Sequence, residues 1–358
     1  MKQVFGILFV FLLWASPVGA AQSTSVATQV TSFQNGQEVG VLQFSPDGQY
    51  LAVEPTQDLE LHIWSWQRRP HIVRKLIYSR PANILFCREG LKFSPDGRVL
   101  AFGHRVSSDA VIVELYDVAT GAVMHRIAEP DLGGANSNMA FTPDGKYMLR
   151  TYDSANPGVK GQIVMHRTDT WEVLWSLNVL PLFPQTLSIS KDGKLAAVGG
   201  LTNGPGVEQK SRILIVRLST HEIIRTLDNV FPPRAPVTRV SWHPDGIHLA
   251  AGTTGSSIGD LPPPPEPVKI LDTTTGRVVV SESAPPTEIG GLNYSPDGRY
   301  LVENGDLWKT VRIWDGEHRN LLQEIPVHPP ESFAVTVSSD SRYLAVSDRD
   351  RVTVWQLQ

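Results

Sequence analysis

One stretch of the chain resembles a nucleophile motif. Gly255-Ser256-Ser257-Ile258-Gly259 matches the Gly-x-Ser-x-Gly pattern of hydrolases by its letters. In those enzymes the serine sits on a sharp turn between a strand and a helix. Here four prolines follow at 262 to 265, and a proline run does not form that helix. We therefore assign no catalytic role to Ser257, and the sequence favours a protein that is not an enzyme.

Metal and cofactor motifs are missing from the sequence. It contains ten histidines but no His-Glu-x-x-His, no paired Cys-x-x-Cys, no haem-attachment motif and no calcium loop. His104 and His328 are expected on one rim of the fold, and a site there would still need a carboxylate from elsewhere. We interpret them as ordinary surface or loop histidines and predict no metal ion and no cofactor.

Cys87 is the single cysteine, so no internal disulfide can form. The adjacent Arg88 could lower the pKa of the thiol and make it reactive. A small buried hydrophobic residue is the alternative that we favour.

The rest of the chain is organised by a repeated five-residue unit that begins with an apolar residue and centres on Pro-Asp-Gly. Proline presets the first turn dihedral, aspartate bonds to nearby N–H groups, and glycine takes the positive φ that reverses the chain. The aspartates recur every 43 to 53 residues, a period typical of propellers and solenoids. The seven copies begin at Phe44, Phe93, Phe141, Ile189, Trp242, Tyr294 and, in degenerate form, Val337.

Each unit predicts a hairpin that opens a four-stranded repeat. Apolar residues alternate before the turn, as in Leu42 and Phe44, which is the period of a pleated strand. Four strands in seven repeats predict an all-β fold, a single seven-bladed β-propeller. Residues 24 to 33 look like an additional strand, while the chain ends one strand short. We therefore predict that this N-terminal strand pairs with the C-terminal blade and closes the ring.

These motifs resemble those of WD-repeat β-propellers, in particular the bacterial, exported kind rich in Ser-Pro-Asp-Gly repeats that also occurs in the periplasmic Tol-system protein. The resemblance covers residues 24 to 358 and implies a binding scaffold, without implying chemistry. That family's His, Ser/Thr, Asp and Trp tetrad is approached by the last repeat alone. Its candidate members are His328, Ser347, Asp348 or Asp350, and Trp355.

Binding residues are expected on one rim of the propeller. Long connections are predicted there at 153–161, 199–211 and 253–267, together with proline-rich linkers such as 181–185. Loops on a rigid ring commonly carry binding, although neutral variation in loop length is the alternative. The residues that begin the innermost strands would surround the channel mouth, where they bind a ligand or simply line a solvated channel. They are Glu89, Asn138, Gln185, Arg239 and Glu288.

The first twenty residues predict a signal peptide. Lys2 precedes an apolar run from Val4 to Ala15, and Val18-Gly19-Ala20 fits a cleavage site. The run is short for a membrane span. We expect domains 1–20 (signal peptide) and 21–358 (propeller), with export to a periplasmic or extracellular location. The net charge of −4 becomes −5 without the leader, whose one charged side chain is Lys2, so no basic field for nucleic acid is expected.

The sequence therefore predicts a non-enzymatic, monomeric binding scaffold of the cell envelope that presents its long-loop rim to a protein segment or small polar ligand. Two alternatives remain open. One is a propeller enzyme of the lactonase, hydrolase or dehydrogenase type, with a metal or cofactor at the channel mouth. The other is a subunit of a larger envelope complex.

Overall fold

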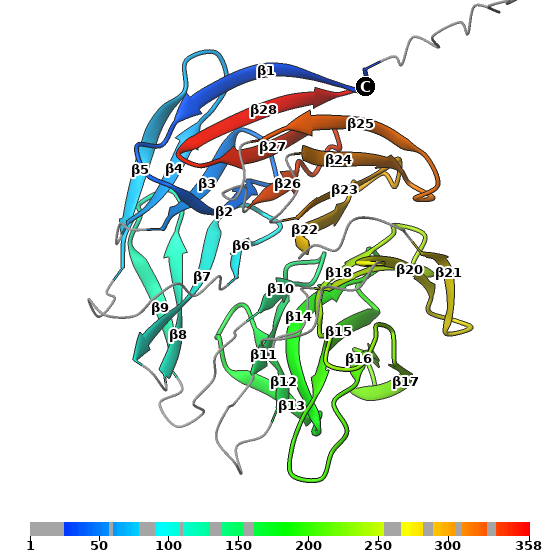
Figure 1. The fold of residues 1–358 in the computed structure, drawn as a ribbon. Helices are drawn as coiled ribbons and strands as arrows, with labels where there is room; N and C mark the ends of the chain where they lie inside the picture. The colour runs from blue at the N-terminus through cyan, green and yellow to red at the C-terminus, as the bar shows by residue number, and fades with distance from the viewer. Residues whose placement is uncertain are drawn as a thin grey trace, which may run out of the picture.

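The fold is a ring of seven β-sheets. The computed structural model describes residues 25–56, 60–78, 90–107, 110–128, 138–152, 161–253, 266–281, 289–305, 310–327 and 334–358. These residues form seven antiparallel sheets of four strands each and contain no helix. The sheets are arranged in a ring (Figure 1), which confirms the predicted seven-bladed β-propeller. Their inner strands line a central channel.

Six blades are formed by consecutive strands, and the seventh combines the two ends of the chain. From the channel outward, blade 1 contains β2 (Val39–Phe44), β3 (Tyr50–Pro55), β4 (Glu60–Ser65) and β5 (His71–Ile77), and blade 2 contains β6 (Leu91–Phe93), β7 (Val99–Ser107), β8 (Ala110–Asp117) and β9 (Val123–Ala128). Blade 3 contains β10 (Met139–Phe141), β11 (Tyr147–Tyr152), β12 (Gln162–Arg167) and β13 (Val173–Asn178), and blade 4 contains β14 (Leu182–Ile189), β15 (Leu195–Thr202), β16 (Ser211–Arg217) and β17 (Glu222–Asp228). Blade 5 contains β18 (Val237–Trp242), β19 (His248–Thr253), β20 (Val268–Asp272) and β21 (Arg277–Ser281). Blade 6 contains β22 (Ile289–Tyr294), β23 (Tyr300–Gly305), β24 (Thr310–Asp315) and β25 (Leu321–Pro326). Blade 7 contains β26 (Val335–Val337), β27 (Tyr343–Asp348), β28 (Arg351–Leu357) and β1 (Ala27–Gln34).

The Pro-Asp-Gly units form the turns between the first and second strands. In blade 1 the Ser45 hydroxyl donates to Asp47 Oδ1 at 2.6 Å, and the same carboxylate oxygen accepts the Gln49 N–H at 3.0 Å. Gly48 has φ +69°, a conformation that glycine adopts without strain. The Ser45 hydroxyl also accepts the Tyr50 N–H at 2.9 Å. The turn is therefore fixed by its own side chains.

The hydrophobic core is divided among the junctions between blades. Seven clusters of buried apolar side chains are present, and each joins residues of two adjacent blades. At the junction of blades 5 and 6, for example, Ile270 packs with Leu292 and Tyr294. Each blade is thus held by both of its neighbours.

The N-terminal strand closes the ring, as predicted. β1 pairs antiparallel with β28 from Ala27 opposite Leu357 to Gln34 opposite Arg351, and the two strands lie side by side in Figure 1. Phe33 is buried and stacks on Trp64 of blade 1, with ring centroids 4.3 Å apart. One strand therefore completes blade 7 and also packs against blade 1.

The two rims of the ring differ in their connections. Because the strands are antiparallel, the turns after the first and third strands share one rim, which we call the turn rim. The other connections lie on the opposite rim, which we call the long-loop rim. Of the predicted 199–211 loop, 203–210 alone is irregular, because β15 continues to Thr202. Residues 153–160 and 254–265 lie outside the described residues.

The prediction that residues 181–185 form a linker is wrong. Apart from Pro181, this segment is the beginning of β14. Leu182 is fully buried against blade 3, and Pro184 is also buried. Burial of these two apolar side chains outweighs the turn tendency of the prolines, since a proline is tolerated in a strand at its first residue or at a bulge.

Replacing Phe33 by alanine is expected to destabilise the closed ring. The change removes a buried aromatic ring and its stack, for which we expect a loss of about 3 kcal/mol in the free energy of unfolding. Urea unfolding measures this loss. Val30 on the same strand is 47% exposed, so Val30→Ala is the control and should change stability by less than about 0.5 kcal/mol. Equal effects of the two substitutions would contradict the role of Phe33.

Candidate functional site

The inner strands enclose a pocket of about 320 Å³ at the centre of the ring. All seven innermost strands or the residues next to them contribute to its wall. Backbone and small side chains make up much of the lining. The polar side chains of the wall are Gln43, Lys92, Asn138, Thr186, Arg239, Asn293 and Thr336.

Four inner strands carry a β-bulge near their start, at the long-loop rim. The ladder register shifts at Gly40, Gln185, Thr238 and Gly290. A bulge adds one unpaired residue and changes the direction of nearby side chains. The ladder of these four inner strands is therefore interrupted near the mouth of the channel.

The structure describes three of the five predicted binding residues. The Asn138 side chain donates to the backbone oxygen of Gln185 at 2.7 Å, which joins blades 3 and 4. Arg239 donates from Nε to Gly290 O at 2.9 Å and from Nη1 to Thr238 O at 2.7 Å. Asn138 and Arg239 line the central pocket. Glu89 and Glu288 lie outside the described residues.

Lys92 is a channel residue that the sequence reasoning missed. It is the middle residue of β6, between the buried Leu91 and Phe93. Burial lowers the pKa of its ammonium group, and the positive charge of Arg239 lowers it further. Two positively charged side chains, Lys92 and Arg239, thus line the same central pocket, which favours the binding of an anionic group there. A lone lysine inside an inner strand was the available sequence signal.

A second cluster of titratable groups is buried within blade 2. Glu114 has a side chain 1% exposed, and it interacts with His104 at 3.3 Å, with Arg126 at 2.7 Å and with the Tyr116 hydroxyl. Burial raises the pKa of Glu114, but the hydrogen bonds from these three groups lower it to about 2. His104 is therefore a partner in a structural network and not an exposed rim histidine.

In the last blade, the described candidates for the tetrad make no hydrogen bond to Trp355 Nε1. The Ser347 hydroxyl accepts the Ala334 N–H at 3.0 Å, and Trp355 Nε1 has no hydrogen-bond partner among the described residues. A similar role is filled in blade 1, where Asn35 Oδ1 lies 2.9 Å from His62 Nδ1 and accepts Trp64 Nε1–H at 3.1 Å. His328 lies outside the described part of the chain, as do Cys87 and Ser257.

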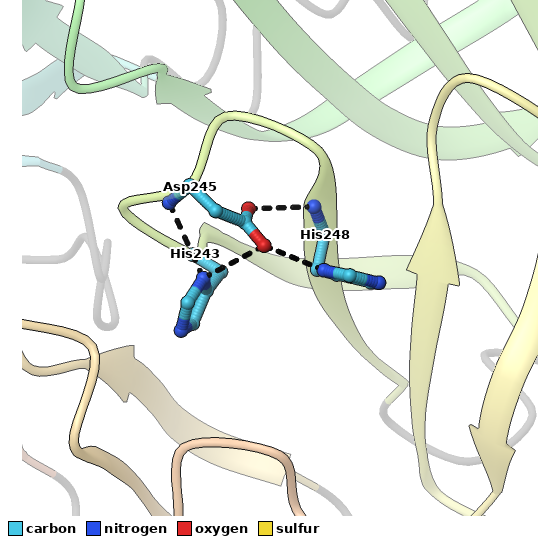
Figure 2. Close-up of side chains that lie close together, drawn as sticks. All are labelled: His243, Asp245 and His248. Atoms are coloured by element: carbon cyan, nitrogen blue, oxygen red, sulfur yellow. Dashed lines mark hydrogen bonds and ion pairs between the residues drawn. The ribbon is translucent and has the colours of Figure 1, made fainter.

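Two histidines and an aspartate meet in the turn of blade 5 (Figure 2). Asp245 Oδ2 lies 3.1 Å from His243 Nδ1 and 2.6 Å from His248 Nδ1. Asp245 Oδ1 accepts the N–H groups of Ile247 at 2.8 Å and His248 at 3.0 Å. Burial raises the pKa of Asp245, but these hydrogen bonds and the His243 charge lower it to about 2.

This cluster is the potential metal-binding group in the described ranges. One ligand atom from each side chain lies within 4.8 Å of the others. It is found on the turn rim, away from the channel mouth where the sequence placed its candidates. His243, Asp245 and His248 lie within six residues of the sequence, but their spacing matches none of the metal motifs considered above, so the sequence did not point to them.

The described segments include no helix with the length and apolar character needed to cross a membrane.

Comparison with known families identifies the repeat. Residues 221–258 and 278–315 match the WD domain, G-beta repeat. Together with the seven blades, this match defines a β-propeller that carries WD40 repeats, an architecture that typically serves as a protein-interaction scaffold.

Two curated relatives are plant proteins. The chain is 24% identical over 119 residues to the WD repeat-containing protein VIP3 of Arabidopsis thaliana. The aligned region covers 30% of this chain and 37% of VIP3. It is 27% identical over 184 residues to SEC12-like protein 2 of the same plant. This aligned region covers 51% of this chain and 43% of the relative. The matches thus span less than half the length of these relatives. The expected likeness to exported bacterial propellers stays a prediction.

Glu114 should make the stability of the fold depend on acid pH. Its pKa is lowered on folding, so its contribution is present above about pH 4.5 and is lost as the pH falls towards about 2. We expect the stability difference between the wild type and Glu114→Gln to shrink by about 3 kcal/mol between about pH 5 and about pH 2. Urea unfolding across this range measures it. Glu222→Gln, at an exposed position on β17, is the control, and an equal pH dependence of wild type and Glu114→Gln would contradict the assignment.

Proposed function

We propose that this protein is a non-enzymatic binding module that receives an acidic segment of a partner protein at the channel mouth on its long-loop rim. The single observation that carries this proposal is the pair of cations in the central pocket. Lys92 and Arg239 come from blades 2 and 5, which are far apart in the sequence, yet the charge of Arg239 affects Lys92. Such a pair stabilises a carboxylate that is withdrawn from water.

The surroundings support a bound group more than a reaction. The described wall of the pocket contains no histidine, cysteine, aspartate or glutamate. A metal held by the described wall would need such ligands, so these residues favour binding, whereas the predicted Glu89 and Glu288 lie outside the described part of the chain. A small polar anion would use the same two cations as an acidic peptide would. The WD40 architecture supports the protein segment.

We further propose that the protein works in the cell envelope after removal of its leader. The sequence of residues 1 to 20 supports this location. A scaffold of this kind can act alone or as one subunit of an envelope complex, and in both cases the partner contacts the long-loop rim.

Removing the channel charge should weaken partner capture. Lys92→Met keeps the length of the side chain and removes its ammonium group. The wild type and the variant each serve as bait in an envelope extract, and the captured proteins are quantified by mass spectrometry. We expect Lys92→Met to retain a specific partner at least about tenfold more weakly than the wild type does. An excess of a glutamate-rich peptide should displace that partner.

Lys146→Met is the matched control for this experiment. Lys146 is exposed on the turn rim, after the Asp144 turn, so its loss should leave capture unchanged. Identical capture by wild type and Lys92→Met would refute the channel-mouth proposal. A partner lost equally from both variants would indicate a non-specific charge effect and would also refute it.

Export predicts a specific mature N-terminus. Expression of the whole chain in a Gram-negative host should yield a periplasmic product that begins at Ala21, as read by N-terminal sequencing. Leu12→Arg interrupts the apolar run and should keep the uncleaved chain in the cytoplasm, whereas Leu12→Val should not. A wild-type chain that retains Met1 would overturn the proposed location.

A further inference from the structure

We propose that the turn between β18 and β19 binds a zinc-class dication through His243 Nδ1, His248 Nδ1 and a carboxylate oxygen of Asp245. This site is independent of the channel mouth and lies on the opposite rim of the ring. Figure 2 shows the three side chains converging from one short segment.

The other six blades provide an internal comparison for this turn. At the position of His243 they have a hydroxyl, which donates to the turn aspartate at 2.6 to 2.7 Å. At the position of His248 they have Tyr, Val or Leu. The residues that correspond to His243 are Ser45, Ser94, Thr142, Ser190, Ser295 and Ser338, and those that correspond to His248 are Tyr50, Val99, Tyr147, Leu195, Tyr300 and Tyr343. The turn therefore folds without imidazoles, and blade 5 has acquired two potential ligands in one turn.

The hydrogen bonds of His243 orient it as metal ligands are commonly oriented. Its Nε2 lies 3.3 Å from the backbone oxygen of Gly298 in blade 6 and can contact that oxygen favourably only as a donor. In the neutral ring this leaves Nδ1 as an acceptor, which accepts the Asp245 N–H at 3.2 Å and lies 3.1 Å from Asp245 Oδ2. A cation at Nδ1 replaces this hydrogen bond and attracts both the nitrogen lone pair and the carboxylate. Donation of the second ring N–H to a backbone carbonyl is the usual outer contact of a metal-bound histidine.

The approach of His243 to blade 6 requires a glycine. A Cβ atom at residue 298 would lie 2.7 Å from His243 Nε2, and Gly298 has φ +79°. The Tyr294 ring packs edge-on against the imidazole, with centroids 5.0 Å apart. The position of His243 is thus fixed from two sides.

A pocket beside the three ligands provides room for further coordination. It has a volume of about 310 Å³, and its wall includes Tyr294, Glu317 and Arg319. Tyr294 is 7% exposed, and its hydroxyl has no hydrogen-bond partner among the described residues. A metal-bound water is a natural partner for such a hydroxyl, because a buried polar group is costly when unpaired. This hydroxyl is a second, independent indication of a ligand.

The ligand set selects the metal. Two imidazoles and one carboxylate suit Zn²⁺, whereas Mg²⁺ prefers oxygen ligands. Tetrahedral Zn²⁺ places its ligand atoms about 3.3 to 3.5 Å apart. The present separations of 2.6 and 3.1 Å to Asp245 Oδ2 need to lengthen by less than about 1 Å. The side chains are 23%, 32% and 38% exposed for His243, Asp245 and His248, so ions can reach them.

The test measures zinc binding by tag-free protein. Isothermal titration with ZnCl₂ and metal analysis after dialysis should give one Zn²⁺ per wild-type chain, and MgCl₂ should give no binding. His243→Ser and His248→Tyr install residues that the other turns already contain, so the fold should survive, as circular dichroism can confirm. Each should weaken zinc binding at least tenfold. His71→Ser, at an exposed position on β5, should have no effect.

A pair of aspartate variants separates metal binding from turn stability. Asp245→Asn and Asp47→Asn both remove the carboxylate of a turn, but Asp245→Asn alone should reduce zinc affinity. Zinc should raise the melting temperature of the wild type and not that of His243→Ser. The proposal is overturned if the wild type fails to bind Zn²⁺, or if His243→Ser and Asp245→Asn bind it as tightly as the wild type does.

Discussion

The structure depends on the burial of both faces of every blade. A four-stranded sheet cannot cover its own apolar faces, so each face packs on the neighbouring blade, and a buried cluster occupies every one of the seven junctions. Such an arrangement is complete only when the ring is closed. The pairing of β1 with β28, and the stacking of Phe33 on Trp64, therefore complete an interface that no local interaction within a blade could provide.

Burial of the faces also imposes a demand on the polar groups within them. A buried donor or acceptor is costly without a partner, and the blades meet this demand with different residues. Blade 1 joins Asn35 to His62 and Trp64, blade 2 surrounds Glu114, and blade 6 joins Trp314 Nε1 to Glu303 at 2.7 Å. The tetrad of the WD-repeat family is one solution among several.

Local chemistry made much of the fold predictable. The Pro-Asp-Gly units set the position of the first two strands of each blade, and the unpaired strand at the start of the chain indicated how the ring closes. Long-range packing was not predictable in this way. Pro181 suggested a linker, whereas the burial of Leu182 against blade 3 makes the segment a strand. Lys92 and Arg239 are widely separated in the sequence, so their shared pocket became evident only in the closed ring.

A repeated architecture makes departures from the repeat informative. Six of the seven turns bind their aspartate with a hydroxyl, which shows that folding of the turn needs no imidazole. The two histidines beside Asp245 are therefore not needed to form this type of turn. The same comparison applies to the inner strands, where an apolar or neutral wall suffices in most blades but cations are found in blades 2 and 5. Residues that a repeat does not need are the ones that distinguish this propeller from a neutral scaffold, and here they lie on both rims of one rigid ring.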